Sequence, residues 1–292
     1  MKHSLLCAAI FSLTLLYGTV QSQEHKLVKL WETDTLLKVP ESVRYDAAHK
    51  VLYTANIDGQ PWERDAKGSV GKVAPDGRII ASEWVTGLDA PKGMGIHAGK
   101  LYVADVDVVA VIDIAKGKVI QRIAVAGAKG LNDISIDAKG VIYVSDSQTK
   151  KIHRIAKGKA TVVIDNLQGP NGVLVVGSDL YLTNAGGLYK HEKNGALTLI
   201  ADGMEGGTDG IEAVGNGDFI VSCWAGSIWY VYANGKKDHL LDTREQKINS
   251  ADIGYDPVPS LRTAWRHIAF NNSMHFTGKK QPNIEGITLV TE

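Results

Sequence analysis

The chain has 292 residues, a formal net charge of zero, 44% hydrophobic residues and 22% charged residues. These values are typical of a soluble globular protein and argue against intrinsic disorder. The balanced charge provides no basic face of the kind that binds nucleic acid. The length allows one large all-β domain or two ordinary domains, with ample core in either case.

The first 22 residues have the pattern of a secretory signal peptide. Lys2 and His3 precede an apolar run from Leu5 to Tyr17, and cleavage is expected after Ser22. An uncleaved membrane anchor is the alternative, but about thirteen apolar residues are few for a hydrocarbon core of about 30 Å. The sequence therefore predicts an exported protein.

The cysteine content indicates the compartment. Cleavage would leave Cys223 as the one cysteine of the mature chain, so no intramolecular disulfide can form. An exported protein without a disulfide framework fits a bacterial periplasm better than an animal extracellular space. Cys7 lies too early in the apolar run to carry the lipid of a lipoprotein.

A strand-turn-strand unit recurs along the chain at a near-constant interval. The second strand of each unit carries an aromatic residue, and the intervals between these residues are 49, 41, 38 and 38, for Tyr53, Tyr102, Tyr143, Tyr181 and Phe219. This period suits one four-stranded blade of a β-propeller. A β-sandwich is the alternative, but it has no reason to repeat such a unit so regularly.

The second half of each unit also reads as a hairpin. Glycine turns between two strand-like runs occur at 74–77, 115–117, 157–158, 193–195 and 233–235. No long amphipathic helical stretch interrupts the series. We therefore predict an all-β fold, a six-bladed β-propeller with an irregular last blade.

The sixth unit begins at Ser250 and loses its pattern after Val258. The residues from Pro259 to His267 show neither strand alternation nor a turn. The expected organisation is a signal peptide at 1–22, a propeller at 23–258, and an irregular tail or degraded part of the last blade at 259–292. A propeller closes by pairing its N-terminal strand, here 26–31, into the last blade, so an incomplete blade would weaken closure.

One column of polar residues stands at the start of the inner strands. The innermost strands of a propeller run along its central channel, so equivalent residues converge at one mouth, and the column contains Glu41, Lys92, Asn132, Asn171, Asp209 and, less surely, Ala251. Carboxylate and amide oxygens are hard ligands that suit calcium, magnesium or manganese better than zinc. The alternative is that the Lys92 ammonium takes the place of the cation.

The returning strands end in a second set of polar residues near the same mouth: Asn56, Asp105, Asp146, Asn184 and Ser222. These residues either orient ligands and bind a polar substrate or, as Asp105 and Asp146 equally allow, cap turns. Trp62, on a long loop that leaves this end, is expected to cover the pocket, and Trp224 to form another wall.

Other catalytic motifs are missing from the sequence. It has no phosphate-binding loop, no His-Glu-x-x-His, no Gly-x-Ser-x-Gly and no paired cysteines. His153, His191, His267 and His275 lie in turn or tail contexts and are expected at the surface. Cys223 has no identifiable base partner and is expected to be a small buried residue.

With these residues in view, the chain resembles the senescence-marker-protein, gluconolactonase and luciferin-regenerating-enzyme family of six-bladed propellers. The matching pieces are Pro40-Glu41, Asn132-Asp133, Pro170-Asn171-Gly172 and Asp209-Gly210, within a span from about Val39 to Tyr255. The resemblance implies one divalent cation, calcium before magnesium, manganese or zinc, held by Glu41, Asn171 and Asp209. Asn132 would bind the metal or the substrate.

The chain departs from this family at three points. An arginine that the family often carries is replaced by Gly130, Lys92 is an added cation, and the sixth blade is degraded. The metal site is therefore expected to transfer better than the substrate.

We predict a periplasmic metal-dependent hydrolase of the gluconolactonase type that acts on a lactone or sugar-acid ester. Asp209, or less readily Asp146, is the expected general base. The expected substrate-binding residues are Asn132, Asp146, Lys92, Trp62 and Trp224. The expected partner is a small-molecule substrate, a sugar lactone, and we expect no nucleic acid partner and no membrane span after signal removal. The alternative is a non-catalytic propeller that binds a small ligand or protein at the same mouth.

Overall fold

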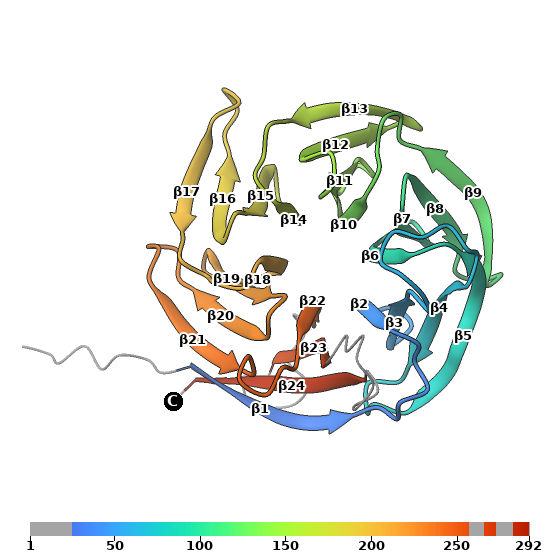
Figure 1. Ribbon diagram of the computed structural model, residues 1–292, viewed down its shortest axis with the longest axis horizontal. Coiled ribbons are helices and arrows are strands. Elements are labelled where there is room, and N and C mark those ends of the chain that lie inside the picture. The colour runs from blue at the N-terminus through green and yellow to red at the C-terminus, as the bar shows by residue number, and fades with distance from the viewer. Residues whose placement is uncertain (1–24, 257–265, 273–282, 292) are drawn as a thin grey trace, which may run out of the picture.

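The protein is a β-propeller whose sheets are arranged in a ring around a central axis (Figure 1). The computed structural model describes residues 25–256, 266–272 and 283–291. Every regular element within these residues is a β-strand, and the strands form six four-stranded antiparallel sheets. The all-β class and the propeller architecture are therefore confirmed. The expected signal peptide lies outside the described residues.

Five sheets each consist of four consecutive strands, ordered from the axis outward. The first sheet contains β2 (Pro40–Asp46), β3 (Val51–Asn56), β4 (Gly68–Val73) and β5 (Ile79–Leu88). The second sheet contains β6 (Pro91–His97), β7 (Lys100–Asp105), β8 (Val108–Asp113) and β9 (Lys118–Ala124). The third is β10 (Leu131–Ile136), β11 (Ile142–Asp146), β12 (Lys151–Ala156) and β13 (Lys159–Ile164). The fourth and fifth are β14 (Pro170–Val176), β15 (Asp179–Asn184), β16 (Gly187–His191) and β17 (Leu197–Ala201), then β18 (Thr208–Gly215), β19 (Asp218–Cys223), β20 (Ser227–Val231) and β21 (Lys237–Asp242).

The sixth sheet joins the two ends of the chain. Its order is β22 (Ser250–Tyr255), β23 (Arg266–Asn272), β24 (Ile284–Thr291) and β1 (His25–Glu32), so the N-terminal strand is the outermost strand. The predicted pairing of the N-terminal strand into the last sheet is confirmed by the antiparallel register of β1 with β24. The strand missing from the pattern after Val258 is β23, which follows residues outside the described set.

The predicted turns connect the outer two strands in each of the first five sheets. Each contains a glycine with a φ between 60° and 88°: Gly77, Gly117, Gly158, Gly195 and Gly235. Glycine adopts this left-handed region at little cost, so these positions let adjacent strands reverse direction tightly. The turn chemistry visible in the sequence thus sets the limits of the outer hairpins.

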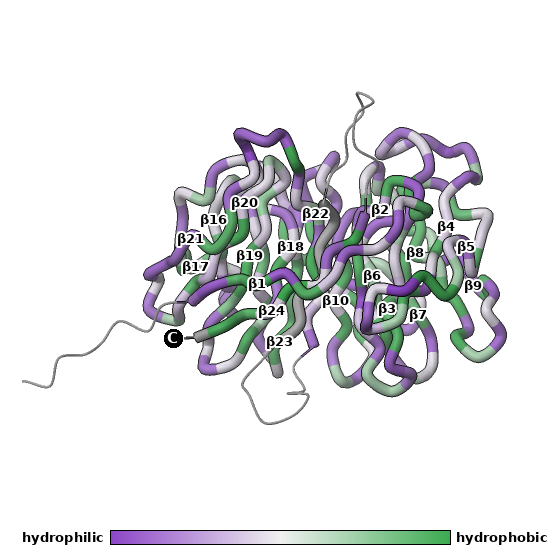
Figure 2. Tube along the Cα trace, turned by 90° about the horizontal axis from the view of Figure 1, so that it is seen from below, coloured by the Kyte–Doolittle hydropathy of each residue, from purple (hydrophilic) through white to green (hydrophobic). Residues whose placement is uncertain are grey.

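The hydrophobic core consists of layers between neighbouring sheets. Tyr53 and Val70 of the first sheet pack with Leu101 and Val103 of the second, and equivalent clusters fill the following interfaces. The ring is completed where Ile284 of the last sheet packs against the first. Hydrophobic residues accordingly follow the strands, whereas many loops on the two faces are hydrophilic (Figure 2).

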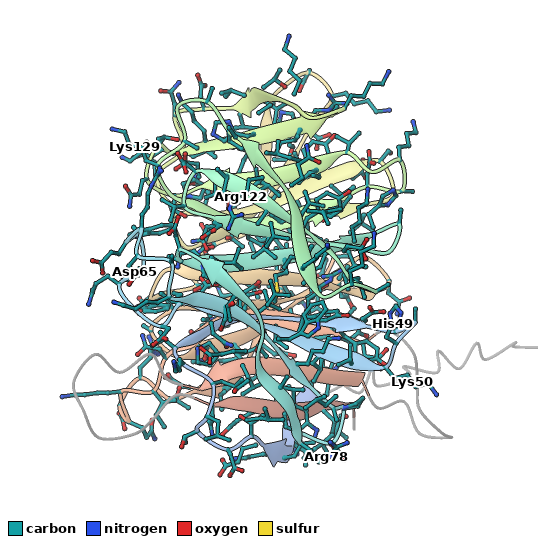
Figure 3. All side chains as sticks on the ribbon, turned by 90° about the vertical axis from the view of Figure 1, so that its right-hand side faces the viewer. His49, Lys50, Asp65, Arg78, Arg122 and Lys129 are labelled. Carbon is teal, nitrogen blue, oxygen red and sulfur yellow. The ribbon has the colours of Figure 1, made fainter. Side chains whose placement is uncertain are left out.

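The propeller has two distinct faces, seen edge-on in Figure 3. Asp65, on the loop between β3 and β4, and Lys129, on the loop that leads into the inner strand β10, lie toward one face (Figure 3). His49 and Lys50, in the turn between β2 and β3, lie toward the other face. The inner strands therefore all begin at the face that carries Asp65. Within the described residues no helix is long and apolar enough to cross a membrane.

Candidate functional site

The predicted column converges on one cavity where the inner strands begin. The cavity has a volume of about 370 Å³ and is lined by Glu41, Pro61, Trp62, Lys92, Asn132, Ser147, Gly169, Pro170, Asn171, Gly207, Thr208, Asp209 and Trp224. The inner strands of five different sheets thus each contribute one polar column residue to the cavity. The two expected tryptophan walls, Trp62 and Trp224, also border it.

A β-bulge at the start of each inner strand explains this convergence. The register of β14 with β15 is interrupted between Pro170 and Val173, and that of β18 with β19 between Thr208 and Ile211. The other inner strands are interrupted at the equivalent place. A bulge releases a residue from regular pairing and redirects its side chain. The column residues lie in these bulges, beside the channel.

Within the described residues, four oxygens of the cavity lining are buried without a hydrogen-bond partner, and one of them is the hydroxyl oxygen Thr208 Oγ1. The other three are carboxylate or amide oxygens. They are Glu41 Oε2, Asn171 Oδ1 and Asp209 Oδ1, one from each of the residues expected to hold a metal. A buried polar atom without a partner is costly, and such atoms are rare in folded proteins. Three such oxygens on one cavity indicate a group that supplies positive charge or hydrogen-bond donors.

Electrostatics at the cavity oppose the ionisation of its carboxyl groups. Burial raises the pKa of Asp209 well above its ordinary value, and the charge of Glu41 raises it further, whereas Lys92 lowers it. Burial likewise raises the pKa of Glu41, against the lowering effect of Lys92. A bound cation would remove this penalty because it stabilises both carboxylates.

The oxygen set suits a divalent metal. Two carboxylates and one amide carbonyl are hard ligands of the type that calcium and magnesium prefer. Within the described residues no group of three His, Cys, Asp or Glu side chains is placed to hold a metal ion. The candidate set contains only two such residues, with Asn171 as the third ligand. The residues present therefore fit a cation that takes an amide oxygen as one of its ligands.

Lys92 lies at the same cavity. Its Nζ is 3.6 Å from Glu41 Oε1, and both side chains are almost completely buried. The ammonium also lies 4.5 Å from the centre of the Trp62 ring, within the range of a cation–π interaction. The ammonium approaches Oε1 and leaves Glu41 Oε2 without a partner, so it does not satisfy the three oxygens.

Asn132 is fixed by a short chain of hydrogen bonds. Its Nδ2 donates to Ser147 Oγ at 3.0 Å, and Ser147 Oγ donates to the Pro170 carbonyl at 2.7 Å. The carbonyl oxygen of the Asn132 amide remains as an acceptor at the cavity. This arrangement suits a ligand that carries a hydroxyl group.

Asp146 is the one expected site residue that does not line the cavity. It accepts hydrogen bonds from the backbone N–H groups of Lys129, Gly130 and Thr149, at 3.0, 3.1 and 2.9 Å. Its carboxylate therefore holds the loop before β10, because those donors occupy its oxygens. The structure thus gives Asp146 a role in holding this loop, and its contact with substrate stays a prediction.

The rest of the second set of polar residues is also bonded to protein groups. Asp105 accepts from the backbone of Asp89 and Ala90, and Asn184 accepts from Gln168. Asn56 donates to a backbone carbonyl, and Ser222 bridges two inner strands. None of these residues lines the cavity. Turn chemistry is thus the better interpretation of the set.

His153 contradicts its expected exposure. It is 2% exposed, and its Nε2 lies 3.7 Å from Asp146 Oδ2. Ile152 and Ile155 on the same strand are also buried. The short apolar pattern of β12 was therefore the sequence feature that could have predicted the burial of His153. Cys223 is fully buried as predicted, and burial raises the pKa of its thiol to about 11, which makes it a poor nucleophile.

Two acids deeper in the channel escaped prediction. Asp133 accepts a 2.7 Å hydrogen bond from Val173 N, and Asp252 accepts one of 2.7 Å from Ser42 Oγ. Each follows the column by one residue. The sequence feature that could have identified them is their position, one residue after Asn132 and Ala251 of the column. They tie neighbouring inner strands together rather than line the cavity.

Toward the other end of the channel, Arg44 Nη1 lies 3.0 Å from Glu212 Oε1. This ion pair joins β2 to β18, which belong to different sheets. Burial raises the pKa of Glu212 to about 7, while Arg44 opposes the rise. The channel therefore has paired charges here, in contrast to the unpartnered oxygens at the mouth.

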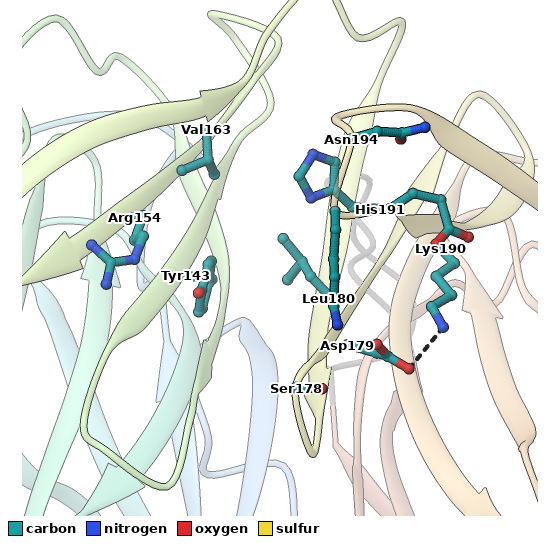
Figure 4. Close-up of a pocket in the computed structure, with 11 residues that line it drawn as sticks. Tyr143, Arg154, Val163, Ser178, Asp179, Leu180, Lys190, His191 and Asn194 are labelled. Carbon is teal, nitrogen blue, oxygen red and sulfur yellow. Dashed lines mark hydrogen bonds and ion pairs between the residues drawn. The ribbon is translucent and has the colours of Figure 1, made fainter.

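A larger groove of about 740 Å³ lies between the third and fourth sheets (Figure 4). Tyr143 and Arg154 form one wall, and His191 and Lys190 lie on the other, where Lys190 is paired with Asp179 at 2.7 Å. This groove includes the turn between β14 and β15, at the face opposite the column. The predicted residues do not reach it.

Gly130 packs closely against the Gln148 side chain. A Cβ at this position would lie 2.6 Å from Gln148 Cγ, so the Gln148 side chain occupies the adjacent space. A longer side chain at 130 would have to displace Gln148. The local packing is therefore built around glycine.

Solved structures of proteins with different activities share this propeller fold. No protein-family model matches the chain, and no curated protein matches it in sequence. Among solved structures, a gluconolactonase from Xanthomonas campestris has a TM-score of 0.65 and 16% identity, over 90% of this chain and 89% of that chain.

Two further structures show the breadth of the class. The calcium-binding protein regucalcin from Agrobacterium tumefaciens has a TM-score of 0.63 and 16% identity, over 89% of this chain and 95% of that chain. A streptogramin B lyase has a TM-score of 0.62 and 12% identity, over 91% and 98%. Identities this low show a shared fold, and the resemblance drawn from the motifs is matched at that level.

Proposed function

We propose that this chain is an exported, six-bladed propeller hydrolase that uses one divalent cation, calcium first, to open a lactone or sugar-acid ester. The observation that carries the proposal is the convergence of the unpartnered oxygens of Glu41, Asn171 and Asp209 on one cavity. The fold shared with a gluconolactonase and with a calcium-binding protein supports it.

The cavity residues divide the chemistry between them. A cation held by Glu41, Asn171 and Asp209 would polarise the ester carbonyl and make a bound water more acidic. Asp209 takes a proton from the attacking water, whose oxygen bonds to the carbonyl carbon. The ring C–O bond breaks, and the leaving oxygen receives the proton, which gives a hydroxy acid. Asn132 and the two tryptophans orient the ring.

Metal content and activity of Asp209→Asn test the proposal together. We expect about one divalent ion per wild-type chain, and loss of both the ion and at least about 100-fold of lactone hydrolysis in the variant, the range that a general base supplies. Asp202→Asn is the matched control, because Asp202 is exposed and outside the cavity lining. Full activity with bound metal in Asp209→Asn would refute the assignment.

The position of Lys92 beside Glu41 favours a second candidate. In that case the ammonium stands in for the cation, and the propeller binds a small ligand or protein without catalysis. Purified wild-type protein would then contain no divalent ion, whereas Lys92→Ala would gain a cation site. A stoichiometric ion in the wild type excludes this candidate.

Export is proposed from the N-terminal pattern and can be tested separately. Expression with residues 1–22 in a Gram-negative host should place the mature chain, beginning at Gln23, in the periplasmic fraction. N-terminal sequencing measures the cleavage position. A full-length chain that stays with the membrane fraction would support the anchor instead.

A further inference from the structure

The Lys92 ammonium lines the cavity, and its ion-pair partner within the described residues is Glu41. The Lys92 side chain is 3% exposed, and the 3.6 Å separation from Glu41 Oε1 exceeds the range of an N–H···O hydrogen bond. Within the described residues its Nζ donates to no other group. An ammonium has three N–H donors, and one carboxylate oxygen at 3.6 Å leaves donors available, so a ligand is expected to supply an acceptor.

The charges at the cavity give the sign of that ligand. Glu41 and Asp209 supply two negative charges to the lining, and a divalent cation between them would balance both. The nearby acids Asp133 and Asp252 accept hydrogen bonds from Val173 N and Ser42 Oγ and do not line the cavity, so within the lining the Lys92 charge would then be left over. Because the Lys92 side chain is only 3% exposed, its positive charge is weakly screened and attracts an anion.

Trp62 holds the ammonium in place. Its ring lies 4.5 Å from Lys92 Nζ and belongs to the same lining. The ring covers one side of the ammonium without taking a hydrogen bond, since a cation–π contact leaves the N–H groups available. Lys92 therefore remains able to donate into the cavity.

We infer that Lys92 binds a carboxylate of the substrate, so that the proposed hydrolase acts on a hydroxylated lactone that carries an additional carboxylate. This inference rests on the proposed function for the lactone and on the geometry for the anion. Asn132 lines the cavity and its Nδ2 is engaged by Ser147 Oγ, so its carbonyl oxygen would accept from a substrate hydroxyl. A cavity of about 370 Å³ limits the ligand to a small molecule.

A series of six-carbon polyols tests the inference without hydrolysis. Sorbitol, gluconate and glucarate carry no, one and two carboxylates, and binding can be followed by the fluorescence of Trp62 and Trp224. Wild-type protein in its purified metal state should bind glucarate about tenfold more tightly than gluconate, and sorbitol more weakly than either, since a charge-assisted hydrogen bond is the added contact.

Variants of Lys92 assign the preference to the ammonium. Lys92→Met should reduce the glucarate-to-gluconate ratio to about one, whereas Lys92→Arg should retain most of it. Lys118→Met is the matched control because Lys118 is an exposed lysine on β9. Thermal unfolding establishes that each variant is folded. Should Lys92→Met fail to fold, Lys92→Arg and the wild-type ligand series still decide the outcome.

Three outcomes would overturn the inference. The first is equal binding of glucarate and gluconate by the wild type, the second is a preference that Lys92→Met leaves unchanged, and the third is tighter binding of 6-phosphogluconate than of glucarate. Parallel assays of glucono- and glucaro-lactone hydrolysis and metal content report on the proposed function. Absence of metal and hydrolysis would refute that function, while the binding ratios would still report on Lys92.

Discussion

At the scale of single residues, the pKa values of two equivalent aspartates are shifted in opposite directions. Asp105 and Asp146 end equivalent strands, and each holds the loop before the inner strand of its own sheet. Burial raises the pKa of Asp105 to about 6. Burial alone would also raise the pKa of Asp146, but His153 and the N–H groups of Thr149 and Lys129 lower it to about 2. The hydrogen-bonding neighbours of each carboxylate therefore decide whether its pKa is raised or lowered.

This difference predicts how stability depends on pH at Asp105. The folded pKa is about 6, above the unfolded value near 4, so the folded state binds more protons between these limits. Stability should fall as the pH rises from 4 to 6, by about 2 kcal/mol, and Asp105→Asn should remove this fall. Urea unfolding at pH 4 and pH 7 measures it. An unchanged pH dependence in Asp105→Asn would contradict the prediction.

Asp146 should behave in the opposite way. Its folded pKa is lowered to about 2, so its contribution to stability is present above about pH 4 and is lost as the pH falls toward 2. Asp146→Asn should therefore be less stable than the wild type at pH 7, with a difference that shrinks under acid conditions. The same urea titration measures this, and a difference that grows in acid would count against it.

At the scale of the inner strand, glycine next to the column allows the strands to approach closely. A Cβ at Gly172 would lie 2.4 Å from the carbonyl oxygen of Asp209, and one at Gly93 would lie 2.5 Å from Asp133 Cα. These positions need space rather than an unusual backbone conformation. The close approach places the column residues of adjacent strands on one cavity.

Gly172→Ala should therefore weaken both the fold and the site. Overpacking of this kind costs about 1–3 kcal/mol, and here it would displace the strand that carries Asp209. We expect a lower free energy of unfolding and weaker metal binding, measured by urea titration and isothermal calorimetry. Gly177→Asn is the control, because nothing lies near that turn and asparagine tolerates its left-handed conformation. Equal loss in both variants would refute the packing argument.

At the scale of the whole molecule, closure of the ring depends on both chain ends. The Trp31 ring lies against Gly286 of β24 and Gly77 of the first sheet, where added Cβ atoms would meet it. Ser42 Oγ donates to Asp252 Oδ2 at 2.7 Å and joins the first inner strand to the last. The predicted weakness of the last blade is thus opposed by contacts between residues far apart in sequence.

Trp31→Ala should open this closure. Trp31 is half-buried, so we expect a loss of about 2 kcal/mol, below the range for a fully buried tryptophan. The effect should appear as a lower unfolding midpoint in urea. Leu30→Ala, at a residue 46% exposed on the same strand, should cost less than about 1 kcal/mol. A comparable loss at Leu30 would show that general strand stability, rather than closure, is involved.

Most of the fold and much of the site could be read from the sequence. The regular spacing of aromatic residues predicted the propeller, and the register of the column predicted the convergence of Glu41, Asn132, Asn171 and Asp209. The sequence left two roles open where one residue type serves two purposes. Aspartate at Asp146 could cap a loop or face a ligand, and only the positions of the Lys129 and Gly130 N–H groups distinguish the two.

The sequence by itself determined the repeat, the turns and the polar column, because strand periodicity and turn chemistry are local properties. The tertiary structure decided which oxygens of the column lack partners, where Lys92 lies relative to Glu41, and how β24 joins β1. Each of these depends on distances between residues far apart in the chain. Such distances are set by the packing of whole sheets against one another.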